Sequence, residues 1–185
     1  MSARRSFIRF GALALAGTAA FATVGAQAAT STAVASVTRS STATMAPAIA
    51  RSEVIARAET WHPHTAQRIP YSQSAYHGGY RTDCSGYASM ALGLSAPGPN
   101  TVGLASSSIS TPISMGELLT GDLVIDATGN SNTRHVVIFQ QWADGAHSSY
   151  WAYEQRGGYG TDHRVLTYGL ASGSEFHAYR PRVLG

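Results

Sequence analysis

The single cysteine of the chain, Cys84, has the setting of a nucleophile. It lies in Asp83-Cys84-Ser85-Gly86, at the start of a segment whose apolar residues recur at helical spacing. The unpaired N–H groups and positive dipole end of a helix start stabilise a thiolate, the nucleophilic form of cysteine. Gly86 also removes side-chain bulk close to the sulfur. The alternative is a buried, inert thiol, because lone cysteines are often buried, but the small and polar neighbours favour the nucleophile.

A cysteine nucleophile needs a general base, and the chain has seven histidines. We select His135, which opens the apolar segment 135–139 directly after a polar loop, a place where catalytic side chains are usually presented. The histidines with a weaker case lie in loops or beside later strands; they are His62, His64, His77, His163 and His177. No carboxylate or third histidine joins His62 and His64 at useful spacing, so we predict no metal site and no cofactor.

The secondary structure expected around these groups changes along the chain from helices to strands. Residues 52–61 and 84–94 have helical periodicity, with Ser52 and Asp83 as the expected caps. From about residue 118, short apolar or aromatic runs alternate with turn residues, which indicates strands. The expected strands contain residues 123–125, 136–139, 150–153, 165–168 and 176–179. This order predicts an α+β domain whose N-terminal helices pack on a mostly antiparallel sheet of about five to six strands.

The N-terminal residues predict export. Residues 1–28 have the features of an export signal peptide, with three arginines, an apolar run and a small-residue cleavage site at 26–28. The apolar run is too short for a secure membrane span, so we expect none in the mature chain. The pair Arg4-Arg5 fits either the Sec or the twin-arginine route. Residues 29–50 are rich in Ala, Ser and Thr and predict a flexible linker, which leaves 51–185 as the folded domain.

The composition excludes several kinds of function. Of the 185 residues only 12% are charged, and all 13 basic residues are arginines. Without the three arginines of the signal peptide, 10 basic and 10 acidic residues remain, and this balance argues against a nucleic-acid or anionic-lipid surface. One cysteine excludes an intramolecular disulfide, a thiolate zinc cluster and an iron–sulfur site.

Four motifs follow one another in a recognisable order. They are Pro70-Tyr71, Arg81-Thr82-Asp83-Cys84-Ser85-Gly86-Tyr87, Gly121-Asp122-Leu123-Val124 and His135-Val136-Val137-Ile138-Phe139. In this order they resemble the NlpC family of papain-like cell-wall cysteine peptidases. The resemblance covers about residues 51–180, nearly all of the expected domain.

The resemblance implies a papain-like α+β fold and a thiol-dependent hydrolase of peptide bonds in bacterial peptidoglycan stems, commonly the D-γ-glutamyl to diamino-acid bond. Transferred residue by residue, it makes Cys84 the nucleophile and His135 the general base. It makes Tyr71 a substrate-binding or oxyanion-side residue, and it places Asp83 and Ser85 along the substrate groove. We expect a secreted or wall-associated monomer whose partner is the stem peptide.

The third catalytic group has three candidates. The family often has a histidine about a dozen residues after the base, and His147 has that spacing. However, if Asp144-Gly145 forms a two-residue hairpin turn, His135 directly faces Glu154 across the strands, whereas His147 lies roughly 23 Å along the strand. A slip by one residue exchanges the faces and brings in Gln155. We therefore predict Glu154, with Gln155 and His147 as alternatives.

Two other functions remain open at this point. A CHAP-type peptidoglycan amidohydrolase shares the papain-like layout, cuts amide or cross-bridge bonds, and often has glutamate or asparagine as its third group. A non-catalytic wall-binding module keeps the fold without turnover. The aspartate before the cysteine and the later Gly121-Asp122 favour the NlpC reading over the first alternative, and the joint presence of Cys84 and His135 disfavours the second.

Overall fold

The structure is a computed structural model that describes residues 48–185. The predicted signal peptide and most of the predicted linker lie outside the described residues. Ile49, at the end of that linker, forms a parallel bridge to Leu184, so the fold already includes this residue. None of the helices in the described part of the chain is long and apolar enough to cross a membrane.

The first helix, α1 (Arg51–Glu59), buries Val54 and Ala58 against the rest of the domain. The predicted cap Ser52 is wrong, because the helix begins one residue earlier and its N-cap, Ala50, provides no side-chain hydrogen bond. Arg51 instead secures this end, since its guanidinium donates to the carboxylate of buried Asp122 at 2.9 Å.

The second helix, α2 (Cys84–Ala91), begins where the sequence predicts and is capped by Asp83, whose carboxylate accepts from the Gly86 N–H at 2.6 Å. It ends at Ala91 rather than residue 94. Position 86 requires glycine, because an added Cβ would lie 2.0 Å from the carbonyl oxygen of Arg81. The chain before α2 therefore passes directly against its first turn. This close approach could not be predicted from the sequence.

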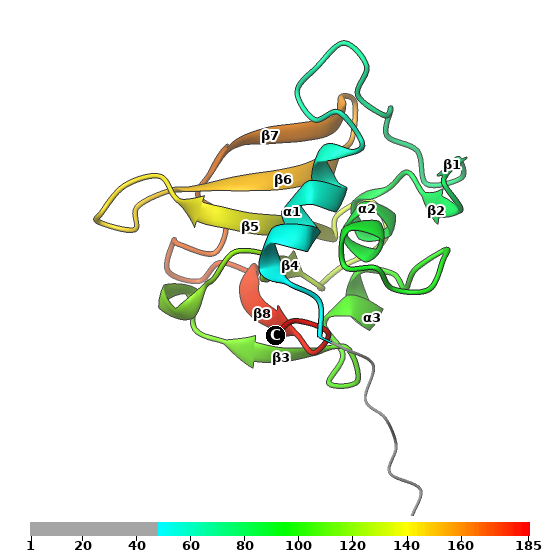
Figure 1. The fold of residues 1–185 in the computed structure, drawn as a ribbon. Helices are drawn as coiled ribbons and strands as arrows, with labels where there is room; N and C mark the ends of the chain where they lie inside the picture. The colour runs from blue at the N-terminus through cyan, green and yellow to red at the C-terminus, as the bar shows by residue number, and fades with distance from the viewer. Residues whose placement is uncertain (1–47) are drawn as a thin grey trace, which may run out of the picture. The chain divides into compact units, whose positions relative to one another are not determined.

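The predicted α+β class and antiparallel sheet are confirmed. Six strands form one sheet in the order β3-β8-β4-β5-β6-β7, with every neighbouring pair antiparallel (Figure 1). Their bounds are β3 (Ser110–Ile113), β4 (Leu123–Asp126), β5 (His135–Trp142), β6 (Tyr150–Arg156), β7 (Gly160–Leu166) and β8 (His177–Pro181). The run predicted at 165–168 forms only the end of β7.

The sequence analysis missed the short elements. These are the small hairpin of β1 (Tyr76–His77) and β2 (Tyr80–Arg81), α3 (Thr101–Leu104), β3 and a 3-10 turn, η1 (Met115–Glu117). β3 lacks apolar alternation and contains Pro112, a residue that edge strands tolerate.

Hydrophobic side chains cover both faces of the sheet. α1 and α2 lie side by side against one face (Figure 1), where Val136 and Ile138 of β5 join their core. Val137 and Phe139 point the other way, into a second cluster with Tyr150 of β6. This alternation fixes the register, because a slip by one residue would exchange the two faces.

The predicted register of the β5–β6 hairpin is wrong by two residues. Phe139 pairs with Ala152 and Val137 with Glu154, and the register shifts again at a bulge between Phe139 and Gln141. His135 is therefore not directly opposite Glu154. It lies two residues before Val137 on the same face, which makes Glu154 its diagonal neighbour.

The hairpin loop explains the error. Residues 144–148 form a longer loop than the predicted two-residue turn, closed by a hydrogen bond from the Ala143 N–H to the Ser149 carbonyl oxygen. Asp144 holds this loop, because its carboxylate accepts from the backbone N–H groups of Ala146 and Ser148. These bonds and those from the Ser148 and Ser149 hydroxyls lower the pKa of Asp144 to about 2.

Candidate active site

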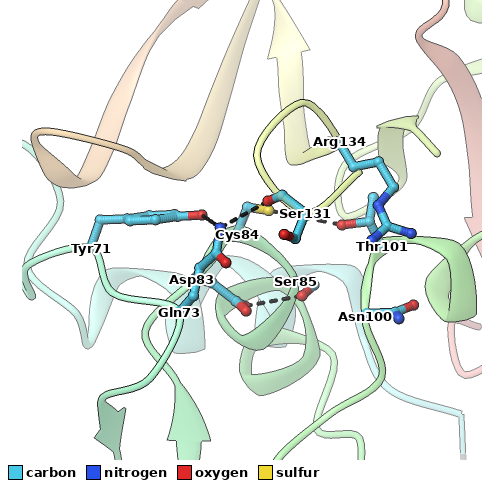
Figure 2. A pocket seen from close by; sticks show the side chains of 9 residues that line it. All are labelled: Tyr71, Gln73, Asp83, Cys84, Ser85, Asn100, Thr101, Ser131 and Arg134. Carbon is cyan, nitrogen blue, oxygen red and sulfur yellow. Dashed lines mark hydrogen bonds between the residues drawn. The ribbon is translucent and has the colours of Figure 1, made fainter. Parts of the chain in front are cut away.

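Cys84 is the first residue of α2 and is only 5% exposed. Its sulfur borders a small cavity of about 60 Å³ and lies 3.9 Å from the hydroxyl oxygen of Thr101. In Figure 2 Tyr71 approaches Cys84 from one side, while Thr101 and Arg134 lie on the other. The nucleophile predicted from the sequence is thus reachable from a cavity, although only a narrow part of its surface is open.

Asp83 and Ser85, which the resemblance places along a substrate groove, line this cavity, and their hydrogen bonds also hold its wall in place. The Asp83 carboxylate caps α2 and accepts from the Ser85 hydroxyl at 3.0 Å and from the Arg81 Nε at 2.9 Å. Arg81 continues to the carbonyl oxygens of Gly98 and Pro99. These bonds hold the start of α2 against its neighbouring loops, so that the position of the thiol is fixed.

His135 opens β5 at the end of the sheet next to α2, and its Nε2 lies 2.8 Å from Glu154 Oε2. Burial alone would lower the pKa of this histidine. Hydrogen bonding to Cys84 and Glu154, together with their negative charges, outweighs the burial and raises the pKa to about 9. The site therefore favours a protonated imidazole beside the sulfur.

Glu154 is fully buried and contacts His135 through one of its carboxylate oxygens. Its second oxygen accepts from the Arg164 Nε, and Arg164 in turn donates to the Tyr168 hydroxyl at 3.2 Å. Burial would raise the pKa of Glu154, but the bonds and charges of His135 and Arg164 lower it. The carboxylate is thus kept ionised and aimed at the imidazole.

Gln155 and His147, the two alternatives for the third catalytic group, do not lie beside the His135 ring. Gln155 points to the other face of β6, where its amide donates to the carbonyl oxygens of Ile69, Pro70 and Thr82. His147 lies in the loop beyond the far end of β5, where its ring stacks on Trp142 with centroids 4.1 Å apart. Neither residue contacts His135 in the described part of the chain, whereas Glu154 does.

Tyr71 lies where the small cavity meets a larger one. The larger cavity has a volume of about 510 Å³ and is bordered by His135, Glu154 and Arg164, and Tyr71 lines both. Burial, and then the negative charges of Cys84 and Asp83, raise the pKa of Tyr71 despite its bond to Gln73. The phenol therefore stays protonated as a hydrogen-bond donor near the sulfur.

Gln73 connects the loop of Tyr71 to the loop that precedes β5. Its amide donates to the Ser131 carbonyl oxygen at 2.8 Å and lies 3.4 Å from the Tyr71 hydroxyl. Gln73, Tyr71 and Arg134 border both cavities. The two cavities are thus neighbouring parts of one groove, one part next to the thiol and the other next to the imidazole.

Several residues of the site were missed by the sequence analysis. Arg134 directly precedes His135, and this position was the only signal for it. Thr101 and Arg164 gave no signal, because they reach the site through separate elements, α3 and β7. Among residues 48–185 no group of three or more His, Cys, Asp or Glu side chains is arranged to hold a metal ion. His64, considered for a metal, instead contacts buried Asp162 at 2.7 Å.

Compared with models of known protein families and with curated proteins, the chain gives no match. The functional conclusion therefore rests on the motifs of the chain and on the geometry of its site.

Proposed function

We propose that the protein is an exported cysteine peptidase of papain-like type, similar to the NlpC family, that hydrolyses peptide bonds in peptidoglycan stem peptides. The observation that carries this proposal is a pair of placements: Cys84 opens α2 beside one part of the groove, and His135, whose Nε2 lies 2.8 Å from Glu154 Oε2, opens β5 beside the neighbouring part. A thiol at a helix start, an imidazole beside it and a carboxylate behind the imidazole are the three groups of a cysteine peptidase. Cys84 borders the smaller of the two neighbouring cavities, and His135 and Glu154 border the larger one.

In the first half of the reaction, the Cys84 thiolate attacks the scissile carbonyl carbon and the carbonyl electrons move onto oxygen. The N–H groups at the start of α2 have no intrahelical partner, and that of Gly86 is used by the Asp83 cap. The N–H of Cys84 and the Tyr71 hydroxyl are therefore the suitable donors to this oxyanion. The His135 imidazolium then gives its proton to the departing nitrogen. The C–N bond breaks, the amine leaves, and the acyl group stays on Cys84 as a thioester.

In the second half, water attacks the thioester carbonyl while the now neutral His135 accepts its proton. The C–S bond breaks, a carboxylic acid is released, and the thiolate–imidazolium pair forms again. Glu154 supports both halves, because its carboxylate keeps the ring oriented and stabilises its protonated form. Arg164 in turn fixes Glu154 from the side opposite to His135.

The substrate class is supported by the motif resemblance and by the predicted export. A second function is favoured by one observation: the third group is a carboxylate, which CHAP-type amidohydrolases often have. The cap formed by Asp83 and the buried Asp122 of the Gly-Asp motif agree with the NlpC pattern. We therefore keep the endopeptidase as the proposal and the amidohydrolase as the alternative.

Digestion of purified peptidoglycan, followed by mass spectrometry of the muropeptides, tests the proposal. The endopeptidase yields fragments cut within the stem, most directly between D-glutamate and the diamino acid. An amidohydrolase of the glycan–stem bond or of the cross-bridge yields different masses. Release of no fragment, with the protein bound to the insoluble wall, would instead show a binding module.

A further inference from the structure

Arg134 differs from the other arginines around the site. Arg81 is paired with Asp83, Arg156 with Asp162, and Arg164 with Glu154. The guanidinium of Arg134 has no hydrogen bond or ion pair to any side chain or carbonyl among residues 48–185, and its Nε is shielded from solvent without a partner. Buried polar groups in folded proteins nearly always have a partner, and a guanidinium nitrogen loses its hydration when it is shielded.

The position of Arg134 suggests what the missing partner is. The side chain borders both cavities, and Figure 2 shows its guanidinium next to Thr101, on the far side of Cys84 from Tyr71. No acidic side chain is paired with it there, because the carboxylate of Asp83, the acidic residue lining the small cavity, is taken by Arg81 and the helix cap. This part of the groove therefore presents an uncompensated positive charge close to the sulfur.

We propose that Arg134 is a specificity-determining residue that binds a carboxylate of the substrate next to the scissile bond. This inference rests on the proposed function and narrows its substrate class to peptides with a free carboxylate near the bond that is cut. The planar guanidinium matches a carboxylate with two parallel hydrogen bonds, whereas a carboxamide at the same place supplies only one uncharged acceptor oxygen. The ion pair positions the substrate carbonyl over Cys84, and Arg134 itself takes no part in bond breaking.

The test uses a synthetic stem peptide and a series in which each free carboxylate is replaced, one at a time, by a carboxamide. kcat/KM is measured for the wild type, Arg134→Gln and Arg134→Lys. The control is Arg182→Gln, which changes an arginine that donates to the Ser107 carbonyl oxygen and does not line either cavity. Calorimetric binding of the same peptides to Cys84→Ala gives a readout that does not need turnover, with and without Arg134→Gln.

We expect one carboxamide to reduce kcat/KM of the wild type by about 10- to 100-fold, the range of a charged hydrogen-bonded contact. Arg134→Gln should suffer the same loss on the parent peptide and no further loss on that carboxamide. Arg134→Lys should be intermediate, and Arg182→Gln should behave as the wild type. The melting temperature of Arg134→Gln should stay unchanged, because the guanidinium has no hydrogen-bond partner to lose within the described part of the chain.

Three results would overturn the inference. The first is an equal loss of kcat/KM for Arg134→Gln on every peptide of the series. The second is a clear fall in the melting temperature of this variant, which would show a structural role. The third is cleavage by the wild type without any dependence on a carboxylate, which would reject the inference and leave the peptidase intact. Carboxylate-dependent binding to Cys84→Ala without cleavage by the wild type would reject the peptidase and support the inference. Absence of binding by every peptide would count against both.

Discussion

The substitution Glu154→Gln separates the charge of the third group from its shape. The pKa of His135 is about 9 in the folded protein against an ordinary value of 6.5, a difference that corresponds to about 3 kcal/mol in favour of the protonated ring. Two groups, Cys84 and Glu154, supply this preference against the effect of burial. Glutamine keeps an oxygen at the place of Oε2 but removes the negative charge, and it leaves Arg164 without its carboxylate.

We expect the alkaline limb of the pH–rate profile, which reports loss of the His135 proton, to move to lower pH by roughly one pH unit in Glu154→Gln. kcat should fall by about 10- to 100-fold with little change in KM, because Glu154 does not touch the substrate. Glu154→Ala should cost more, since the ring also loses its hydrogen-bond partner.

The assay is kcat/KM on a stem peptide between pH 5 and pH 11, combined with NMR titration of the His135 ring. Glu53→Gln is the matched control, because Glu53 is an exposed residue of α1 whose carboxylate, among residues 48–185, pairs only with Arg57. An unchanged alkaline limb in Glu154→Gln, or the same displacement in Glu53→Gln, would refute the reasoning.

Three further predictions concern stability and the hairpin. The raised pKa of His135 contributes stability that is complete below pH 6.5 and is lost as the pH rises through about 9. Between pH 6.5 and 10, the free energy of unfolding measured in urea should therefore fall by up to about 3 kcal/mol more for the wild type than for His135→Gln. Gly86→Ala should lower the free energy of unfolding by about 2–3 kcal/mol, because its added Cβ meets the Arg81 carbonyl oxygen. Gly145→Ala is the control and should leave this free energy nearly unchanged, because a Cβ added there has no atom of the described residues within 4 Å. His147→Ala should keep full activity on the stem peptide, and a strong loss would contradict the observed position of this residue.

The local features of the site could be predicted because short-range physics determines them. The cap formed by Asp83 depends on residues three positions apart, and the uninterrupted apolar run from Val136 to Phe139 indicates a buried strand. Both predictions agree with the structure. The ends of the elements were less accurate, since the close of α2 at Ala91 depends on packing against other parts of the chain.

The prediction of Glu154 as the third catalytic group was based on an incorrect register of the β5–β6 hairpin. A two-residue turn would place Glu154 directly opposite His135, but the loop held by Asp144 displaces the pairing by two residues. Because a displacement of two residues keeps the same face of the sheet, Glu154 became a diagonal neighbour and stayed within reach of the ring. A displacement of one residue would have brought Gln155 to that face instead.

The residues that the sequence did not reveal share one property. Thr101, Arg134 and Arg164 belong to a short helix, a loop and an edge strand whose approach to the site depends on the whole topology. Apart from the position of Arg134 directly before His135, nothing in their local sequence distinguishes them from ordinary surface residues. Only the arrangement of residues 48–185 shows that, within this range, Arg164 is paired with a carboxylate and Arg134 is not.

The central claim is that the Cys84 thiol, activated by His135, hydrolyses a stem-peptide bond. Mass spectrometry of a defined stem peptide incubated with the wild type or with Cys84→Ser tests it most directly. The account predicts two fragments whose masses add up to the substrate plus one water for the wild type. It also predicts a rate at least about 1,000-fold lower for the folded serine variant. Near-normal cleavage by Cys84→Ser, or an intact peptide after incubation with the wild type, would contradict it.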